Sequence, residues 1–111
     1  MKTRILLSSM ALIACIGLSN VSFAQDGRWA ANHPRRDQVN DRLANQHARI
    51  QDKVEDGRMS GRAANRLHRE DHAIRMEERR MASRDGGHIT KYDQRKLNRQ
   101  ENHVSRQIAR H

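Results

Sequence analysis

The segment GRMSGRAANRLHREDHAIRM (residues 57–76) has a counterpart thirty positions later, GHITKYDQRKLNRQENHVSR (residues 87–106). Each copy begins with a glycine, has an apolar residue two positions on and a hydroxyl residue next to it, and then carries a leucine and a β-branched residue seven positions apart. Glycine favours a turn, and serine or threonine favours the N-cap of a helix. Apolar residues seven apart lie on one face of a helix. The repeat therefore predicts two units, each made of a turn, a helix N-cap and an amphipathic helix.

A further helix precedes the repeat. Pro34 suits the first position of a helix, and Asp56-Gly57 ends the apolar pattern that follows it. These signals predict an all-α fold with three amphipathic helices, at about 34–56, 61–84 and 91–110. Because the connections are short, we expect a small up-down-up bundle or an extended helical hairpin.

Each predicted helix carries a narrow apolar stripe, with about one large apolar residue per turn. Such a stripe is closer to the seam of a coiled coil than to the broad face of a globular helix. A homodimer of long helices is therefore an alternative to packing within one chain. The stripes are Val39, Leu43, Ile50 and Val54, then Ala63, Leu67, Ile74 and Met81, then Leu97, Val104 and Ile108.

The first 24 residues have the features of a secretory signal peptide. Lys2 and Arg4 form a basic start, residues 5–18 are largely apolar, and Ser22-Phe-Ala24 places small residues at −3 and −1 of a cleavage site. The sequence thus predicts a signal peptide (1–24), a flexible lead-in (25–33) and a helical domain (34–111).

A lipoprotein is the alternative, because Leu12-Ile-Ala-Cys15 is similar to a lipobox and would anchor the chain at Cys15. Cleavage after Ala24 is preferred, since residues 16–24 are more apolar than a lipoprotein tether. Either processing predicts a protein of the periplasm or the exterior, with no transmembrane helix in the mature form. Cys15 is the one cysteine, so we expect no disulfide in the mature protein.

The predicted mature chain is strongly basic. Removal of Lys2 and Arg4 leaves 20 of the 22 basic residues against 13 acidic ones, which lowers the net charge from +9 to +7. Arginine pairs well with carboxylates and phosphates. For an exported protein this favours unfolded protein or anionic envelope components as partners, and no nucleic acid is expected. The predicted contact residues are Arg62, Arg66, Arg69, Arg95 and Arg99.

A second hypothesis concerns metal binding. His68, His72 and Met76 follow one another at steps of four, so their side chains form a ridge along the second helix. Imidazole and thioether ligands suit Cu, and two imidazoles suit Ni or Zn. The alternative is that these are ordinary exposed residues, with no cofactor bound.

A polar layer is predicted between the leucine and isoleucine/valine levels. Four residues after each leucine come His47, Asp71 and Glu101. If these groups meet inside the fold, an imidazole facing two carboxylates forms a pH-sensitive contact. The alternative is that they lie at the edge of the seam beside neighbouring arginines.

No catalytic constellation is present in the sequence, so we expect that the protein is not an enzyme. The preferred function is a non-catalytic periplasmic binding protein for anionic or unfolded partners, either chaperone-like or an accessory of the envelope stress response. The alternatives are a periplasmic metal-binding or metal-responsive protein and a structural, oligomeric envelope protein.

The sequence resembles small exported proteobacterial helical proteins of unknown function, through Trp29, His33-Pro34 and Gly87-His-Ile-Thr90. It is loosely similar to periplasmic LTxxQ-type stress chaperones at Ile89-Thr90. The second resemblance implies a basic, all-helical protein that binds unfolded clients under envelope or metal stress.

Overall fold

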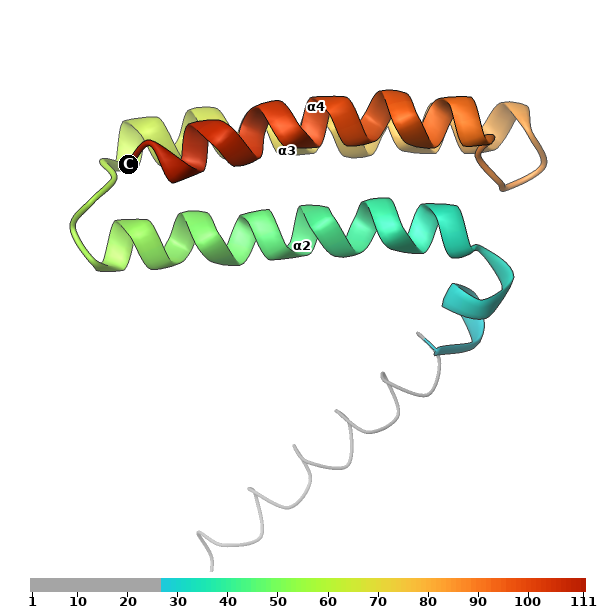
Figure 1. Ribbon diagram of the computed structural model, residues 1–111, viewed down its shortest axis with the longest axis horizontal. Coiled ribbons are helices and arrows are strands. Elements are labelled where there is room, and N and C mark those ends of the chain that lie inside the picture. The colour runs from blue at the N-terminus through green and yellow to red at the C-terminus, as the bar shows by residue number, and fades with distance from the viewer. Residues whose placement is uncertain (1–26) are drawn as a thin grey trace, which may run out of the picture. The chain divides into compact units, whose positions relative to one another are not determined.

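A computed structural model describes residues 27–111, and this part of the chain is helical with no strand. The helices are α2 (Pro34–Glu55), α3 (Gly61–Arg84) and α4 (Lys91–Ala109), shown in Figure 1. The predicted all-α class is therefore confirmed. The predicted signal peptide and the lipobox at Cys15 lie outside the described residues. None of the helices within residues 27–111 combines the length and the apolar content needed to cross a bilayer.

The chain divides after Asn32, and His33–His111 form one unit, which we call the three-helix unit. Residues 27–32 are helical, where the sequence predicted a flexible lead-in. Arg28, Ala30 and Ala31 favour a helix locally, which explains this difference.

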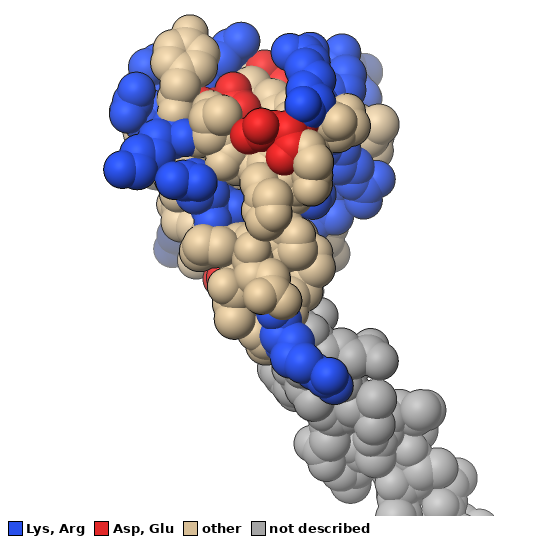
Figure 2. Space-filling model, turned by 90° about the vertical axis from the view of Figure 1, so that its right-hand side faces the viewer, with Lys and Arg blue, Asp and Glu red and all other residues tan. Residues whose placement is uncertain are grey.

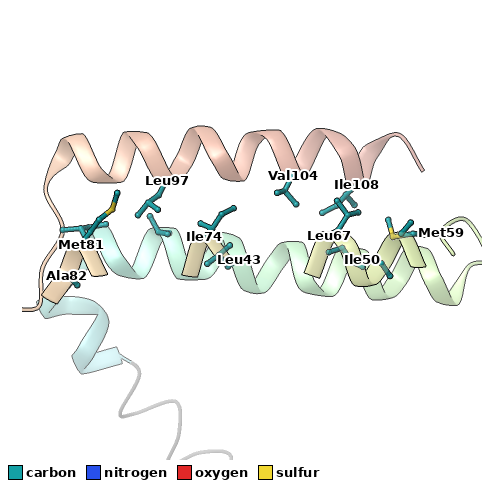
Figure 3. Close-up of a cluster of buried hydrophobic side chains, with 14 residues drawn as sticks. Leu43, Ile50, Met59, Leu67, Ile74, Met81, Ala82, Leu97, Val104 and Ile108 are labelled. Atoms are coloured by element: carbon teal, nitrogen blue, oxygen red, sulfur yellow. The ribbon is translucent and has the colours of Figure 1, made fainter. Parts of the chain in front are cut away.

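Within the three-helix unit, each helix packs against the other two. The chain reverses direction at both connections, so α3 runs antiparallel to α2 and α4 (Figure 1). Buried residues recur at alternating steps of four and three, which is the heptad spacing of a coiled-coil seam. The apolar members meet between the helices, as Figure 3 shows for Ile50, Leu67 and Ile108.

The buried face of α2 differs from the predicted stripe at its C-terminal end. Its buried residues are Val39, Leu43, Gln46 and Ile50, whereas Val54 is 39% exposed. The step after Ile50 is three residues, so the inner position falls on Lys53 and Val54 turns outward. The predicted stripes of α3 and α4 are buried in full.

Both turns use glycine and a hydroxyl cap. Gly57 and Gly87 have backbone φ angles of 75° and 95°. Residues other than glycine rarely adopt such angles. The Ser60 hydroxyl accepts a hydrogen bond from the Ala63 amide at 3.1 Å. Thr90 and Asp93 form a capping box at the start of α4.

The residues just before these caps, Met59 and Ile89, are buried in the core. Each apolar residue of the repeated turn thereby closes one end of the three-helix unit. The turns therefore fix where α3 and α4 begin and also extend the core beyond the helices.

Candidate functional site

All four arginines of α2 bind other parts of the three-helix unit. Arg42 donates to the side-chain oxygens of Asn98 and Asn102 on α4, at 3.3 and 2.6 Å. Arg49 donates to the Ser105 hydroxyl at 2.7 Å. At the start of α2, Arg35 donates to the Ile89 carbonyl in the α3–α4 connection at 3.3 Å. Arg36 donates to the Gly87 carbonyl in the same connection at 3.1 Å and forms an ion pair with the Glu78 carboxylate of α3.

The pair of Arg36 and Glu78 was not foreseen from the sequence. Glu78 is 1% exposed and lies in the α3 seam, seven residues after Asp71. A buried carboxylate needs a partner, and the Arg36 guanidinium provides it from α2. The heptad step beyond Ile74 was the signal that could have identified Glu78 as an inner residue.

The five arginines predicted to contact a partner are all exposed. Within residues 27–111, none of them forms a hydrogen bond or ion pair through its guanidinium, whereas every α2 arginine does. We call this set the free arginines, namely Arg62, Arg66, Arg69, Arg95 and Arg99. Figure 2 shows Lys and Arg on both flanks of the unit at the end where α3 and α4 are joined, with a few acidic side chains between them.

A groove of about 650 Å³ runs between α3 and α4. Ala73, Ile74 and Val104 provide apolar lining, and Arg99 is the one free arginine that lines it. Arg80 and Lys96, which were not predicted as contact residues, add positive charge there. We call this hollow the α3–α4 groove.

The α3–α4 groove also contains acidic groups. Glu70 and Glu77 line it, and Glu77 is paired with Lys96 at 3.5 Å and with the Gln100 amide at 2.9 Å. Glu77 is thus paired with Lys96 and Gln100, and Arg80 and Arg99 remain able to pair with an acidic partner.

The free arginines do not converge on one site. Arg66 lines a separate hollow with Arg110 and His111, and Arg69 lies beside His68 and His72. Arg62 and Arg95 are each near the start of their helix. Because α3 and α4 are antiparallel, these two positions are at opposite ends of the unit. The arrangement is a distributed basic surface, suited to an extended partner.

The predicted polar layer is formed in part. Asp71 is 8% exposed and Glu101 is fully buried, but His47 is exposed and lies outside the core. The inner residue of α2 at this level is Gln46, whose amide donates to the Glu101 carbonyl at 2.7 Å. The prediction for His47 was wrong because α2 steps three residues after its leucine, while α3 and α4 step four.

The two buried carboxyl groups have raised pKa values. The pKa of Glu101 is raised to about 8, mainly by burial; the Arg42 guanidinium opposes this shift, and the charge of Asp71 adds to it. Burial, followed by the charge of Glu70, raises the pKa of Asp71 to about 7. Within the described residues no side-chain oxygen of either group accepts a hydrogen bond. Arg42 approaches Glu101 at 3.7 Å, a distance that fits an ion pair and not a hydrogen bond.

The histidines are arranged differently from the predicted ridge. His68 contacts His47 of α2, with the two Nδ1 atoms 3.2 Å apart and the ring centroids 4.5 Å apart. His72 lines the same hollow as this pair, and Met76 is 42% exposed. Among residues 27–111, no group of three or more His, Cys, Asp or Glu side chains converges as metal ligands do.

The contact between His47 and His68 has a simple sequence signal that was not used. Two antiparallel helices joined by a short turn bring together residues equally far from the middle of that turn. Gly57 and Arg58 occupy the middle, and His47 and His68 are ten residues from them on either side.

Comparison of the chain with protein-family models, with curated proteins and with solved structures returns no match.

Proposed function

We propose that this chain is a non-catalytic periplasmic protein that binds acidic, unfolded polypeptides through the free arginines and the α3–α4 groove. In this proposal, residues 1–24 direct export and are removed, and the remaining three-helix bundle is the binding unit. The proposed function is chaperone-like, and the free arginines and the α3–α4 groove form its binding surface.

The observation that carries this proposal is the contrast between the arginines of α2 and the free arginines. The guanidinium groups of α2 form hydrogen bonds or an ion pair with other helices of the unit, so they are less available to a partner. The free arginines are exposed to solvent and have no acidic partner among the described residues. An exposed guanidinium can form two parallel hydrogen bonds with a carboxylate.

The α3–α4 groove favours an unfolded polypeptide among anionic partners. Its apolar lining at Ile74 and Val104 offers a site for exposed apolar side chains, and Arg80 and Arg99 can pair with acidic residues beside them. A polyanion without apolar groups would use the charge alone. Unfolded acidic chains carry both kinds of group, so they fit both features of this surface.

The test is suppression of aggregation of an acidic client protein by the full mature chain. We expect suppression to weaken as ionic strength rises, because exposed charges are screened over about 8 Å at physiological salt. Replacement of all five free arginines by glutamate should abolish suppression. Replacement of the same five residues by lysine keeps the positive charge but loses the bidentate contacts, so most of the suppression of aggregation should remain.

Circular dichroism of each variant is the control for folding, since these side chains are exposed. Unchanged suppression by the folded glutamate variant would refute the proposal. Suppression lost to lysine and glutamate alike would assign the binding to guanidinium geometry and not to charge.

A further inference from the structure

A pair of imidazoles joins α2 to α3 on one side of the three-helix unit. His47 and His68 come from different helices and place their Nδ1 atoms 3.2 Å apart. The pair lies at a hollow of about 430 Å³ that Leu43, Asp71 and His72 also line. The proposed binding of unfolded chains makes no use of this place.

The separation of the two nitrogens matches that of two ligands on one metal ion. Ligand nitrogens at 2.0–2.1 Å from a tetrahedral Zn²⁺ are about 3.3 Å apart, and adjacent nitrogens in a square-planar Cu²⁺ or Ni²⁺ site are about 2.9 Å apart. The observed 3.2 Å lies between these values. We propose that His47 and His68 together bind one transition-metal ion, Zn²⁺, Ni²⁺ or Cu²⁺, between α2 and α3.

A third donor is available beside the two imidazoles. Asp71 follows His68 by three residues and lines the same hollow, and neither of its carboxylate oxygens has a hydrogen-bond partner within the described residues. His72 lies one turn after His68. Water and one of these side chains can complete the coordination after a change of rotamer, which fits the finding that three ligands do not yet converge.

The hollow beside the two imidazoles is lined by groups of both charges. Arg75 is the one basic side chain apart from the histidines that lines the hollow, and it opposes a cation there. Asp71, which lines the same hollow, offsets that charge when its carboxyl group is ionised.

A metal ion at this place would link two helices, whereas the ridge of His68, His72 and Met76 lies on α3 alone. The two arrangements predict different effects of mutation. Only a site between helices depends on His47, and only such a site stabilises the packing of α2 on α3 when the ion binds.

Calorimetric titration of the untagged mature protein with Zn²⁺, Ni²⁺ and Cu²⁺ tests this inference. We expect one ion per chain for at least one of the three metals, and at least a tenfold loss of affinity in both His47→Ala and His68→Ala. Matched controls are Met76→Ala on the α3 ridge and His103→Ala on α4, where the imidazole contacts Gln107 at 2.6 Å. Both controls should bind as the wild type does.

Thermal unfolding with and without metal provides a second measurement. The wild type should gain melting temperature with the ion, and His47→Ala should not. If apo His47→Ala is destabilised, His47→Gln replaces it as a more conservative variant. Electron paramagnetic resonance of the Cu²⁺ complex should show coupling to two nitrogens that is lost in either histidine variant.

Equal affinity in the wild type and in His47→Ala would overturn the inference, as would dependence on Met76. The variant with five arginines replaced by glutamate should still bind the metal. This separates failure of the metal site from failure of the proposed function.

Discussion

The arginines of α2 and those of α3 and α4 have the same chemistry and opposite surroundings. Arg36, Arg42 and Arg49 reach across to neighbouring helices and bind carboxylate, amide or hydroxyl oxygens. Arg62 and Arg99 are exposed and have no such partner within residues 27–111. An arginine that reaches an oxygen on a neighbouring helix becomes a structural contact, and one that reaches none remains available for a partner.

The polar contacts of α2 are also divided unequally between α4 and α3. Most polar contacts of α2 go to α4, through Arg42, Gln46 and Arg49. Toward α3, α2 offers the pair of Arg36 and Glu78 and the contact between His47 and His68. The α2–α4 packing therefore has more hydrogen-bonded support, and the α2–α3 packing has more to gain from an added ligand.

The largest effect is expected from Arg36→Ala. This change leaves the Glu78 carboxylate buried and without its ion-pair partner, so we expect a loss of about 3 kcal/mol of unfolding free energy. Arg62→Ala, at an exposed position of α3, should change it by less than about 0.5 kcal/mol. Urea unfolding of both variants measures the difference, and equal effects would remove the distinction between the two groups of arginines.

A smaller effect, which depends on pH, is expected from Glu101→Gln. The pKa of Glu101 is raised in the fold, so folding favours the neutral acid. The stability contributed by this group is complete below its unfolded pKa and is lost as pH rises from about 4.5 to about 8. The variant lacks this loss, so above pH 8 it should be more stable than the wild type by on the order of 2 kcal/mol.

Unfolding measured between pH 4 and pH 9 tests this expectation. Glu55→Gln, at the exposed end of α2, is the control and should follow the wild type. The same decline with pH in Glu101→Gln as in the wild type would show that the Arg42 guanidinium keeps Glu101 charged in the fold.

The smallest effect on stability is expected from replacing arginine by lysine. Arg42→Lys loses the contacts with Asn98 and Asn102 from two nitrogens, so we expect about 1 kcal/mol of destabilisation. Arg99→Lys should leave stability unchanged and weaken binding of an acidic client about two- to threefold, as expected for one exposed contact. Thermal unfolding and client titration of the two variants together would sharpen the contrast, and it would fail if Arg99→Lys were the less stable of the two.

Local signals in the sequence were sufficient for the helices and turns. The glycines before Met59 and Ile89, the caps at Ser60 and Thr90, and the leucines seven residues before a β-branched residue act within one or two turns of chain. Such signals need no knowledge of the neighbouring helices. The expected limits of α2, α3 and α4 therefore lie within one residue of those observed.

Positions that depend on a neighbouring helix could not be obtained in this way. A heptad seam permits a step of three or of four residues, and in the packed α2 the step after Leu43 is three, which makes Gln46 the inner residue in place of His47. The same packing brings His47 to His68 and Arg36 to Glu78. The amino-acid sequence determined that this chain forms basic, amphipathic helices with capped turns, because those properties are local. Only the tertiary structure decided which polar groups are buried and which arginines remain free, because that depends on how each helix is rotated against the other two.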